Sequence, residues 1–269
     1  MQQGPPPSYL QTMYLTKGAT AFGGSQDAND GASWMQALNW YEDAGESWSE
    51  QPISVCPLIR ECCIQLNNAL PDEERGTLIG PHLWTPLGTI STPEVELARA
   101  YLCVNRSLLV WARDKRAKPF YGEHWEKMQG LETITSSADA LAASTSADAL
   151  AAGIIAWDAA CEADIQATQT YNSGSIRYID RADAAYVCAA AAKAAYGLAK
   201  DDPFNAAAFT ALAGARYSTK ELLKLILEMC DMGKRLEIGS VKSRDEVLEE
   251  VCMVPTPLPE LGPRQGEPS

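Results

Sequence analysis

The chain has 269 residues, of which 46% are hydrophobic, and this is enough to form a packed core without disulfides or bound metals. Its formal net charge of -13 at pH 7 repels phosphate backbones, so we expect no nucleic-acid binding over most of the surface. The amino terminus lacks the apolar core of a signal peptide and no apolar run approaches the roughly 20 residues of a membrane span, so we expect a soluble cytoplasmic protein that does not bind membranes.

The amino-terminal residues 1–33 contain three consecutive prolines, a Gly-Gly-Ser run at 23–25 and an Asp- and Asn-rich run at 27–31, with too little apolar periodicity for a packed element. We interpret them as an irregular arm that lies outside the core. A single helical domain is expected over residues 34–253, with a first helical half at 34–118 and an alanine-rich half at 137–253. The proline-rich tail at 254–269 is predicted to be disordered.

A first helix is expected over residues 34–44, where Ser33 is placed to cap the first N–H groups. A second helix begins at Pro57, and its repeating apolar side chains predict a core helix. Those side chains are Ile59, Cys63, Leu66 and Leu70. Pro71 starts a short third helix with three carboxylates in its first turn, which the helix dipole stabilises. An acid/base cluster is the alternative interpretation of these carboxylates, and the dipole alone is the simpler one.

Residues 92–114 show the strongest helical pattern of the chain, because two apolar stripes run side by side along them. The stripes consist of Leu97, Tyr101, Val104, Leu108 and Trp111, and of Val95, Ala98, Leu102, Leu109 and Ala112. Pro93 suits the first helical position, and Ser91 and Glu94 have the spacing of a capping box. We predict a central helix in which Trp111 is fully buried.

A basic cluster follows this helix and includes Arg113, Lys115 and Arg116. Cations are favourable where the helix dipole leaves partial negative charge, so the simplest interpretation is a solvated basic turn. The alternative is that these three residues form a partner surface that binds an acidic protein or a phosphate.

The segment at residues 80–90 is too rich in proline and glycine for a long helix, but it is apolar enough to lie against the core. A bundle of helices can also hold a pocket. Near residues 80–99, the candidate polar groups of such a pocket are His82, Glu94 and Arg99.

The alanine-rich half begins with a duplication of Ser-Ala-Asp-Ala-Leu-Ala-Ala at an offset of nine residues. Nine residues turn an α-helix by half a circle, so we predict a break at Ser144-Thr145 and a new helix capped by Ser146. A helix over 176–200 and another from Asp202-Pro203 should follow. The expected inward residues of the first helix are Ile179, Tyr186, Ala190 and Ala194, and the second helix carries Phe204, Ala208, Ala211 and Ala215.

A capping box at residues 218–221 predicts a further helix with a stripe of leucine, isoleucine and methionine, ended by Gly233. Residues 243–246 repeat the capping-box spacing and predict one short last helix. The whole pattern is that of an all-α protein, a compact multi-helix bundle.

Three runs of the sequence, AGESWSEQP at 44–52, LNNALPDEER at 66–75 and LGTISTPEVE at 87–96, stand out together with the unit WDAA at 157–160. In these features the chain resembles an uncharacterised alanine-rich helical family found in bacterial and phage genomes, most specifically over residues 40–112. The resemblance implies an all-helical fold and a phage or bacterial accessory setting. It implies no activity.

The usual motifs for phosphate cradling, nucleophilic hydrolysis and metal hydrolysis are missing from the sequence. The eight cysteines form no repeated Cys-x-x-Cys pattern, so we interpret them as reduced core residues and expect no metal or other cofactor. A nucleophilic cysteine paired with His82 or His124 stays open, because such partners meet only in the fold.

These observations favour a non-catalytic interaction protein that binds an unknown protein partner or forms a homo-oligomer. The alternative is a small-molecule-sequestering protein, or an enzyme, with its pocket near residues 80–99.

Overall fold

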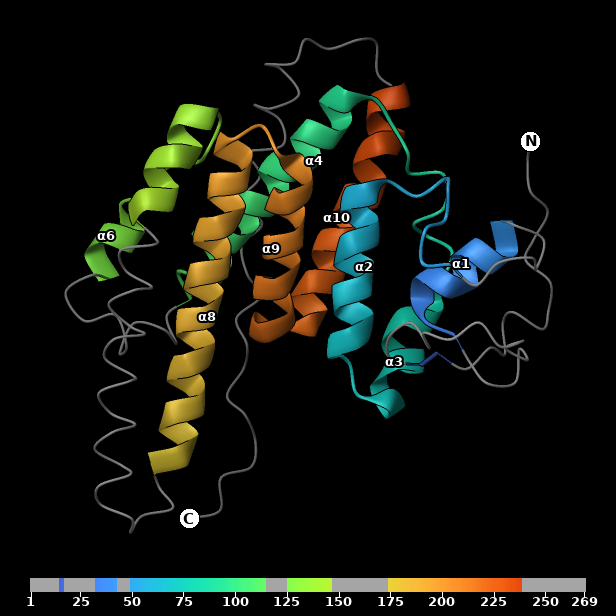
Figure 1. Cartoon of the computed structure of the whole chain (residues 1–269), viewed down its shortest axis with the longest axis horizontal. Coiled ribbons are helices and arrows are strands. Elements are labelled where there is room, and N and C mark those ends of the chain that lie inside the picture. The colour runs from blue at the N-terminus through green and yellow to red at the C-terminus, as the bar shows by residue number, and fades with distance from the viewer. Residues whose placement is uncertain (1–14, 17–31, 43–48, 115–124, 147–173, 239–269) are drawn as a thin grey trace.

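A computed structural model shows the fold of the chain (Figure 1). The structure describes residues 15–16, 32–42, 49–114, 125–146 and 174–238. These residues form helices and short connections without a strand, and an isolated parallel bridge joins Leu15 to Ala32. The predicted all-α class is confirmed. Among the described residues, no helix has the length and apolar character needed to cross a membrane.

In chain order, the helices are α1 (Trp34–Glu42), α2 (Pro57–Ala69), α3 (Asp72–Ile79), the 3-10 turn η3 (Gly80–His82), α4 (Pro93–Asn105), the π-helical segment η4 (Arg106–Trp111), α6 (Trp125–Gln129), α8 (Gly174–Ala199), α9 (Pro203–Tyr217) and α10 (Thr219–Ile238). Residues 137–146 are also helical.

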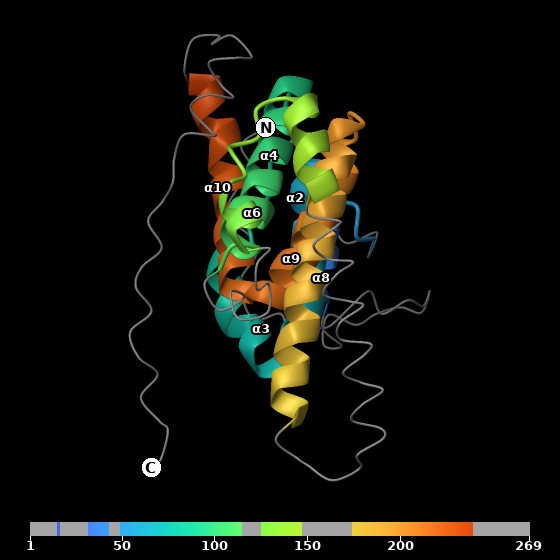
Figure 2. The ribbon, with the colours of Figure 1, turned by 90° about the vertical axis from the view of Figure 1, so that its left-hand side faces the viewer.

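The long helices pack as a bundle in which α9 lies between α8 and α2, with α4 and α10 behind them (Figure 1). Figure 2 shows α4, α8 and α10 extending along one common direction. α1 and α3 lie beyond α2, on the side away from α8. α9 contacts α2, α4, η4, α8 and α10, so it shares the central position that the sequence assigned to residues 92–114 alone.

Some of the helix starts predicted from the sequence agree with the structure, and one does not. Ser33 caps α1 as predicted, and its backbone N–H donates to Gln36 Oε1 at 2.9 Å while Gln36 N–H donates back to Ser33 Oγ at 3.4 Å. Pro57 and Pro93 occupy first-turn positions of α2 and α4. The predicted capping box at the start of α4 is wrong, because the residue preceding that helix is Thr92 and no side chain caps it.

The second half of the predicted central helix is π-helical rather than α-helical. α4 ends at Asn105, and η4 continues it with wider turns, in which the Ala112 N–H donates to the Ser107 carbonyl at 2.9 Å. Trp111 is buried as predicted. Its ring fills the space beside Gly214, where an added Cβ would lie 2.7 Å from the indole.

The alanine-rich helices pack closely but not on every predicted face. Gly197 of α8 lies against α9, where an added Cβ would be 3.0 Å from the Ala206 nitrogen. Ala190 and Ala194 are buried as predicted, but Tyr186, also predicted to face inward, is exposed, and so is Phe204 of α9. The buried residues of α9 are Ala206, Ala207, Thr210, Ala211, Ala213 and Gly214.

Two predicted helix ends are also wrong. Ser144 and Thr145 lie inside the helix at 137–146, where Ser144 is buried and Thr145 Oγ1 donates to the Leu141 carbonyl at 3.0 Å. α10 passes Gly233 and ends at Ile238, although its start is as predicted, with the Glu221 N–H donating to Ser218 Oγ. The predicted helices after Ser146 and Ser243 and the predicted tail lie outside the described residues.

The amino-terminal arm differs from the prediction at the positions that the structure describes. Leu15 and Ala32 are buried and belong to the hydrophobic core, and the Thr16 N–H donates to the Ala32 carbonyl at 2.9 Å. An arm segment is therefore docked against the bundle rather than excluded from it.

Candidate functional site

The three residues proposed to line a pocket lie in different environments. Arg99 is fully buried in α4, where Nε donates to the Met229 carbonyl at 3.0 Å and Nη1 donates to the Thr89 carbonyl at 2.8 Å. His82 is half-buried in η3, and Glu94 is exposed in the first turn of α4. Arg99 thus ties α4 to α10 and to the preceding connection instead of lining a pocket open to solvent.

Of the proposed partner surface, Arg113 alone belongs to the described residues, and Lys115 and Arg116 lie outside them. Arg113 is not a freely solvated cation. Its Nη2 donates to the Leu131 carbonyl, and burial lowers the pKa of its guanidinium. Even so, an arginine stays protonated at any physiological pH.

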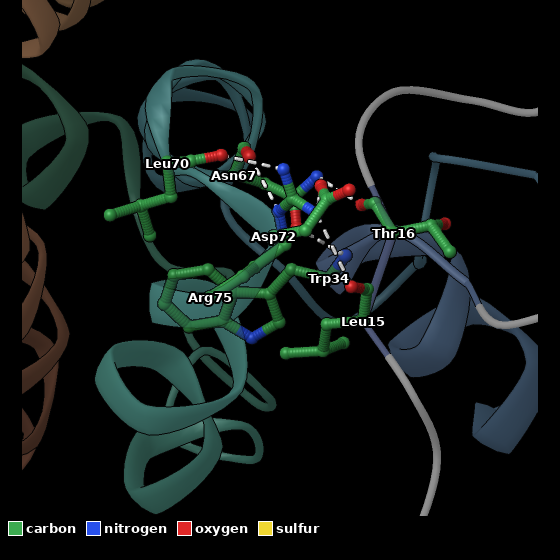
Figure 3. Close-up of polar contacts among 7 residues, drawn as sticks. All are labelled: Leu15, Thr16, Trp34, Asn67, Leu70, Asp72 and Arg75. Atoms are coloured by element: carbon green, nitrogen blue, oxygen red, sulfur yellow. Dashed lines mark hydrogen bonds and ion pairs between the residues drawn. The ribbon is translucent and has the colours of Figure 1, made fainter.

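Sequence reasoning missed a cluster of polar contacts at the corner between α2 and α3 (Figure 3). Arg75 of α3 is fully buried, and its guanidinium reaches back to the carboxyl end of α2. Nε donates to the Asn67 carbonyl at 3.0 Å and Nη2 donates to the Leu70 carbonyl at 2.6 Å. Nη1 pairs with the Asp72 carboxylate at 2.7 Å. The cation therefore satisfies carbonyls left open where α2 ends.

The same guanidinium also binds the arm. Nη1 of Arg75 donates to the Leu15 carbonyl at 3.3 Å. One position further along the arm, Asn67 Nδ2 donates to the Thr16 carbonyl at 2.9 Å. The other amide atom of Asn67, Oδ1, accepts a hydrogen bond from the Trp34 N–H at the start of α1, at 3.2 Å. Asn67 is thereby held between α1 and the arm.

We call the surface formed by Asn67, Arg75 and Ala32 the slot, and residues 15–16 its occupant. The slot holds an extended chain by its main chain, because two carbonyls and one N–H of the occupant are hydrogen-bonded. The Leu15 side chain enters the core beside it, with 3% of its surface exposed. This is the geometry of strand-like peptide recognition, in which main-chain bonds give affinity and an apolar side chain gives specificity.

Away from this buried corner, an exposed surface lies along α8 and α9, where three cations lie over aromatic rings. Arg216 lies 5.2 Å from the ring centroid of Tyr186, Lys193 lies 5.4 Å from that of Phe209, and Lys200 lies 5.5 Å from that of Tyr196. Tyr186 and Tyr196 are both exposed. Aromatic residues and arginine are enriched in protein interfaces, so this surface offers a further place for contact.

The cysteines that the structure describes are buried and free, as predicted; they are Cys56, Cys62, Cys63, Cys103, Cys188 and Cys230. Cys161 and Cys252 lie outside the described residues. A hydrogen bond with Cys103, together with burial, raises the pKa of the Cys62 thiol, and burial raises the pKa of Cys63. A thiol with a raised pKa is a poor nucleophile.

We expect Cys62 and Cys63 of the native protein to resist alkylation by iodoacetamide at pH 8, and to react once urea unfolds the chain. Peptide mapping by mass spectrometry measures this. Because their folded pKa values are raised, the neutral thiols stabilise the native state below the ordinary thiol pKa of about 8.5. This stability is lost as the pH rises further, so the melting temperature should fall above that pH. Alkylation of these two cysteines in the folded protein would contradict their burial.

Comparison of the chain with protein-family models, with curated proteins and with solved structures gave no match. The function is therefore inferred from the geometry of the chain itself.

Proposed function

We propose that this protein is a non-catalytic helical interaction protein that binds an extended segment of a partner protein in the slot at the α2–α3 corner. The observation that supports this proposal is that an amide and a guanidinium, both fixed by the core, donate to consecutive main-chain carbonyls of Leu15 and Thr16. Following the sequence resemblance, we place the protein among the accessory proteins of bacterial or phage genomes.

The slot is formed largely without its occupant. Three of the four hydrogen bonds of the Arg75 guanidinium, to Asn67, Leu70 and Asp72, lie within the α2–α3 corner itself. When residues 15–16 leave, Arg75 keeps these bonds and still presents Nη1 to the vacated position. Because the Arg75 side chain is already ordered, binding an extended chain costs little further conformational entropy at this residue. The slot is therefore preorganised for an extended chain.

In the free protein the arm competes with any partner, because it belongs to the same chain. A segment that belongs to the same chain as its site has a high effective concentration at that site. A partner segment must therefore bind more tightly than the arm or be held by further contacts. The exposed surface of α8 and α9 is one place for such contacts.

The proposal is tested by emptying the slot and supplying the arm as a separate molecule. In the variant Leu15→Asp, a carboxylate would have to enter the core without a partner, so the arm should leave the slot. A fluorescein-labelled peptide spanning residues 8–22 should then bind this variant saturably, measured by fluorescence anisotropy. Wild type should bind the same peptide at least about tenfold more weakly, because its own arm competes.

The matched control is the same peptide with aspartate at position 15, which should not bind either protein. Circular dichroism and thermal melting establish that the Leu15→Asp variant is folded. If the folded variant fails to bind the wild-type peptide, the slot is a structural contact of the arm and the proposed function is wrong.

A further inference from the structure

We infer that the slot is suited to an extended pair of apolar residues, a leucine followed by a β-branched apolar residue such as valine, and that the chain's own Leu15-Thr16 is a weaker, displaceable occupant. This inference rests on the proposed function, because it names the partner segment that the slot selects. It follows from the different fit of the two arm residues (Figure 3).

The first position of the slot fits its occupant fully. The Leu15 carbonyl accepts a hydrogen bond from Arg75, and the Leu15 side chain is buried in the hydrophobic core. Both the polar and the apolar parts of this residue are therefore satisfied, which selects a large aliphatic side chain at this position.

The second position fits the main chain of its occupant but not the side chain. The Thr16 N–H donates to the Ala32 carbonyl, and the Thr16 carbonyl accepts from Asn67 Nδ2, both at 2.9 Å. Thr16 Oγ1, in contrast, is buried and has no hydrogen-bond partner among the described residues. A hydroxyl that loses water without gaining a partner weakens the bound state.

Valine has nearly the shape of threonine, with a methyl group in place of the hydroxyl. It would keep both main-chain hydrogen bonds and would place no polar atom at the buried position of Thr16 Oγ1. Its branched Cβ also favours the extended backbone that the slot requires. The arm thus combines a high effective concentration with an imperfect side chain, so a partner segment with an apolar residue at the second position can displace it.

The inference is tested with two labelled peptides spanning residues 8–22, one with threonine and one with valine at position 16, titrated against the Leu15→Asp variant of the full chain. We expect the valine peptide to bind about 5- to 150-fold more tightly, the factor that corresponds to one buried unpaired hydroxyl. Equal or weaker binding of the valine peptide would overturn the inference while leaving the proposed function intact. Failure of both peptides to bind the folded variant would instead contradict the proposed function.

A second measurement needs no disruption of the core. In the full chain, Thr16→Val should strengthen the docking of the arm, so the melting temperature should rise and the labelled threonine peptide should bind more weakly than it binds wild type. The matched control is Thr145→Val, because Thr145 is exposed on the helix at 137–146 and its hydroxyl has a hydrogen-bond partner. That control should bind the peptide as wild type does. An unchanged or lower melting temperature of Thr16→Val would count against the inference.

Discussion

Replacing Trp111 by alanine is expected to lower the free energy of unfolding by about 3–5 kcal/mol, comparable with the whole stability of many domains. Only 1% of the Trp111 surface is exposed, and its ring stacks on that of Tyr217 with the centroids 5.9 Å apart. Its indole nitrogen has no hydrogen-bond partner among the described residues, so the expected loss is one of packing. Soluble yield and urea denaturation measure the effect.

The matched control for this change is Phe204→Ala, which also truncates an aromatic side chain. Phe204 lies at the start of α9 and is 41% exposed, so its loss should cost less than about 1 kcal/mol. If Trp111→Ala melts within a few degrees of this control, η4 does not contribute to the core as described.

Replacing Arg75 by methionine should be of similar severity, at about 3–5 kcal/mol. The long apolar side chain fills most of the volume, but the carbonyls of Leu15, Asn67 and Leu70 lose their donor. Each buried carbonyl left without a partner costs roughly 1–3 kcal/mol. Urea denaturation followed by circular dichroism measures the change.

The variant Asp72→Asn removes the ion pair with Arg75 and leaves the hydrogen bonds from Arg75 to the carbonyls in place, so it measures the contribution of the ion pair alone. The Asp72 side chain is 65% exposed, and an ion pair of this kind is worth roughly 0–1 kcal/mol, so the variant should be nearly as stable as wild type. If Asp72→Asn destabilised the protein as much as Arg75→Met, the ion pair rather than the carbonyl contacts would hold the corner together.

The helices with large apolar side chains could be predicted from the sequence because their spacing repeats with the helical period. The stripe of α2 is buried at Ile59, Cys63 and Leu66, and the stripe of α10 is buried from Leu222 to Met229. Pro57 and Pro93 marked the helix starts, because a proline is tolerated in the first turn.

The orientation of the alanine-rich helices could be predicted only in part. Alanine occurs all round α8 and α9, so apolar character alone does not distinguish the two faces. The predicted inward face was right at Ala190 and Ala194, which are buried, and wrong at Tyr186, which is exposed. Small residues occupy the interface between α8 and α9 because the two helices meet there closely enough for Gly197 to be needed.

The slot escaped prediction for a different reason. Its contacts join Thr16 to Asn67 and Leu15 to Arg75, pairs separated by 51 and 60 residues. Side-chain bonds to distant carbonyls leave no periodic signal in a sequence. The run from Leu66 to Arg75 showed only a helix, a proline and a second helix, and the pairing with the arm arises from the fold.

The π-helical geometry of η4 gives this segment about one residue more per turn than an α-helix needs. The wider turn, closed by the hydrogen bond from the Ala112 N–H to the Ser107 carbonyl, takes up the extra residue. A chain shortened by one residue in η4 could therefore return to α-helical hydrogen bonds while the Trp111 ring still faced the space beside Gly214. We expect variants of this protein to tolerate a single deletion in η4 better than one in α4, where a deletion would rotate every following side chain by about 100°.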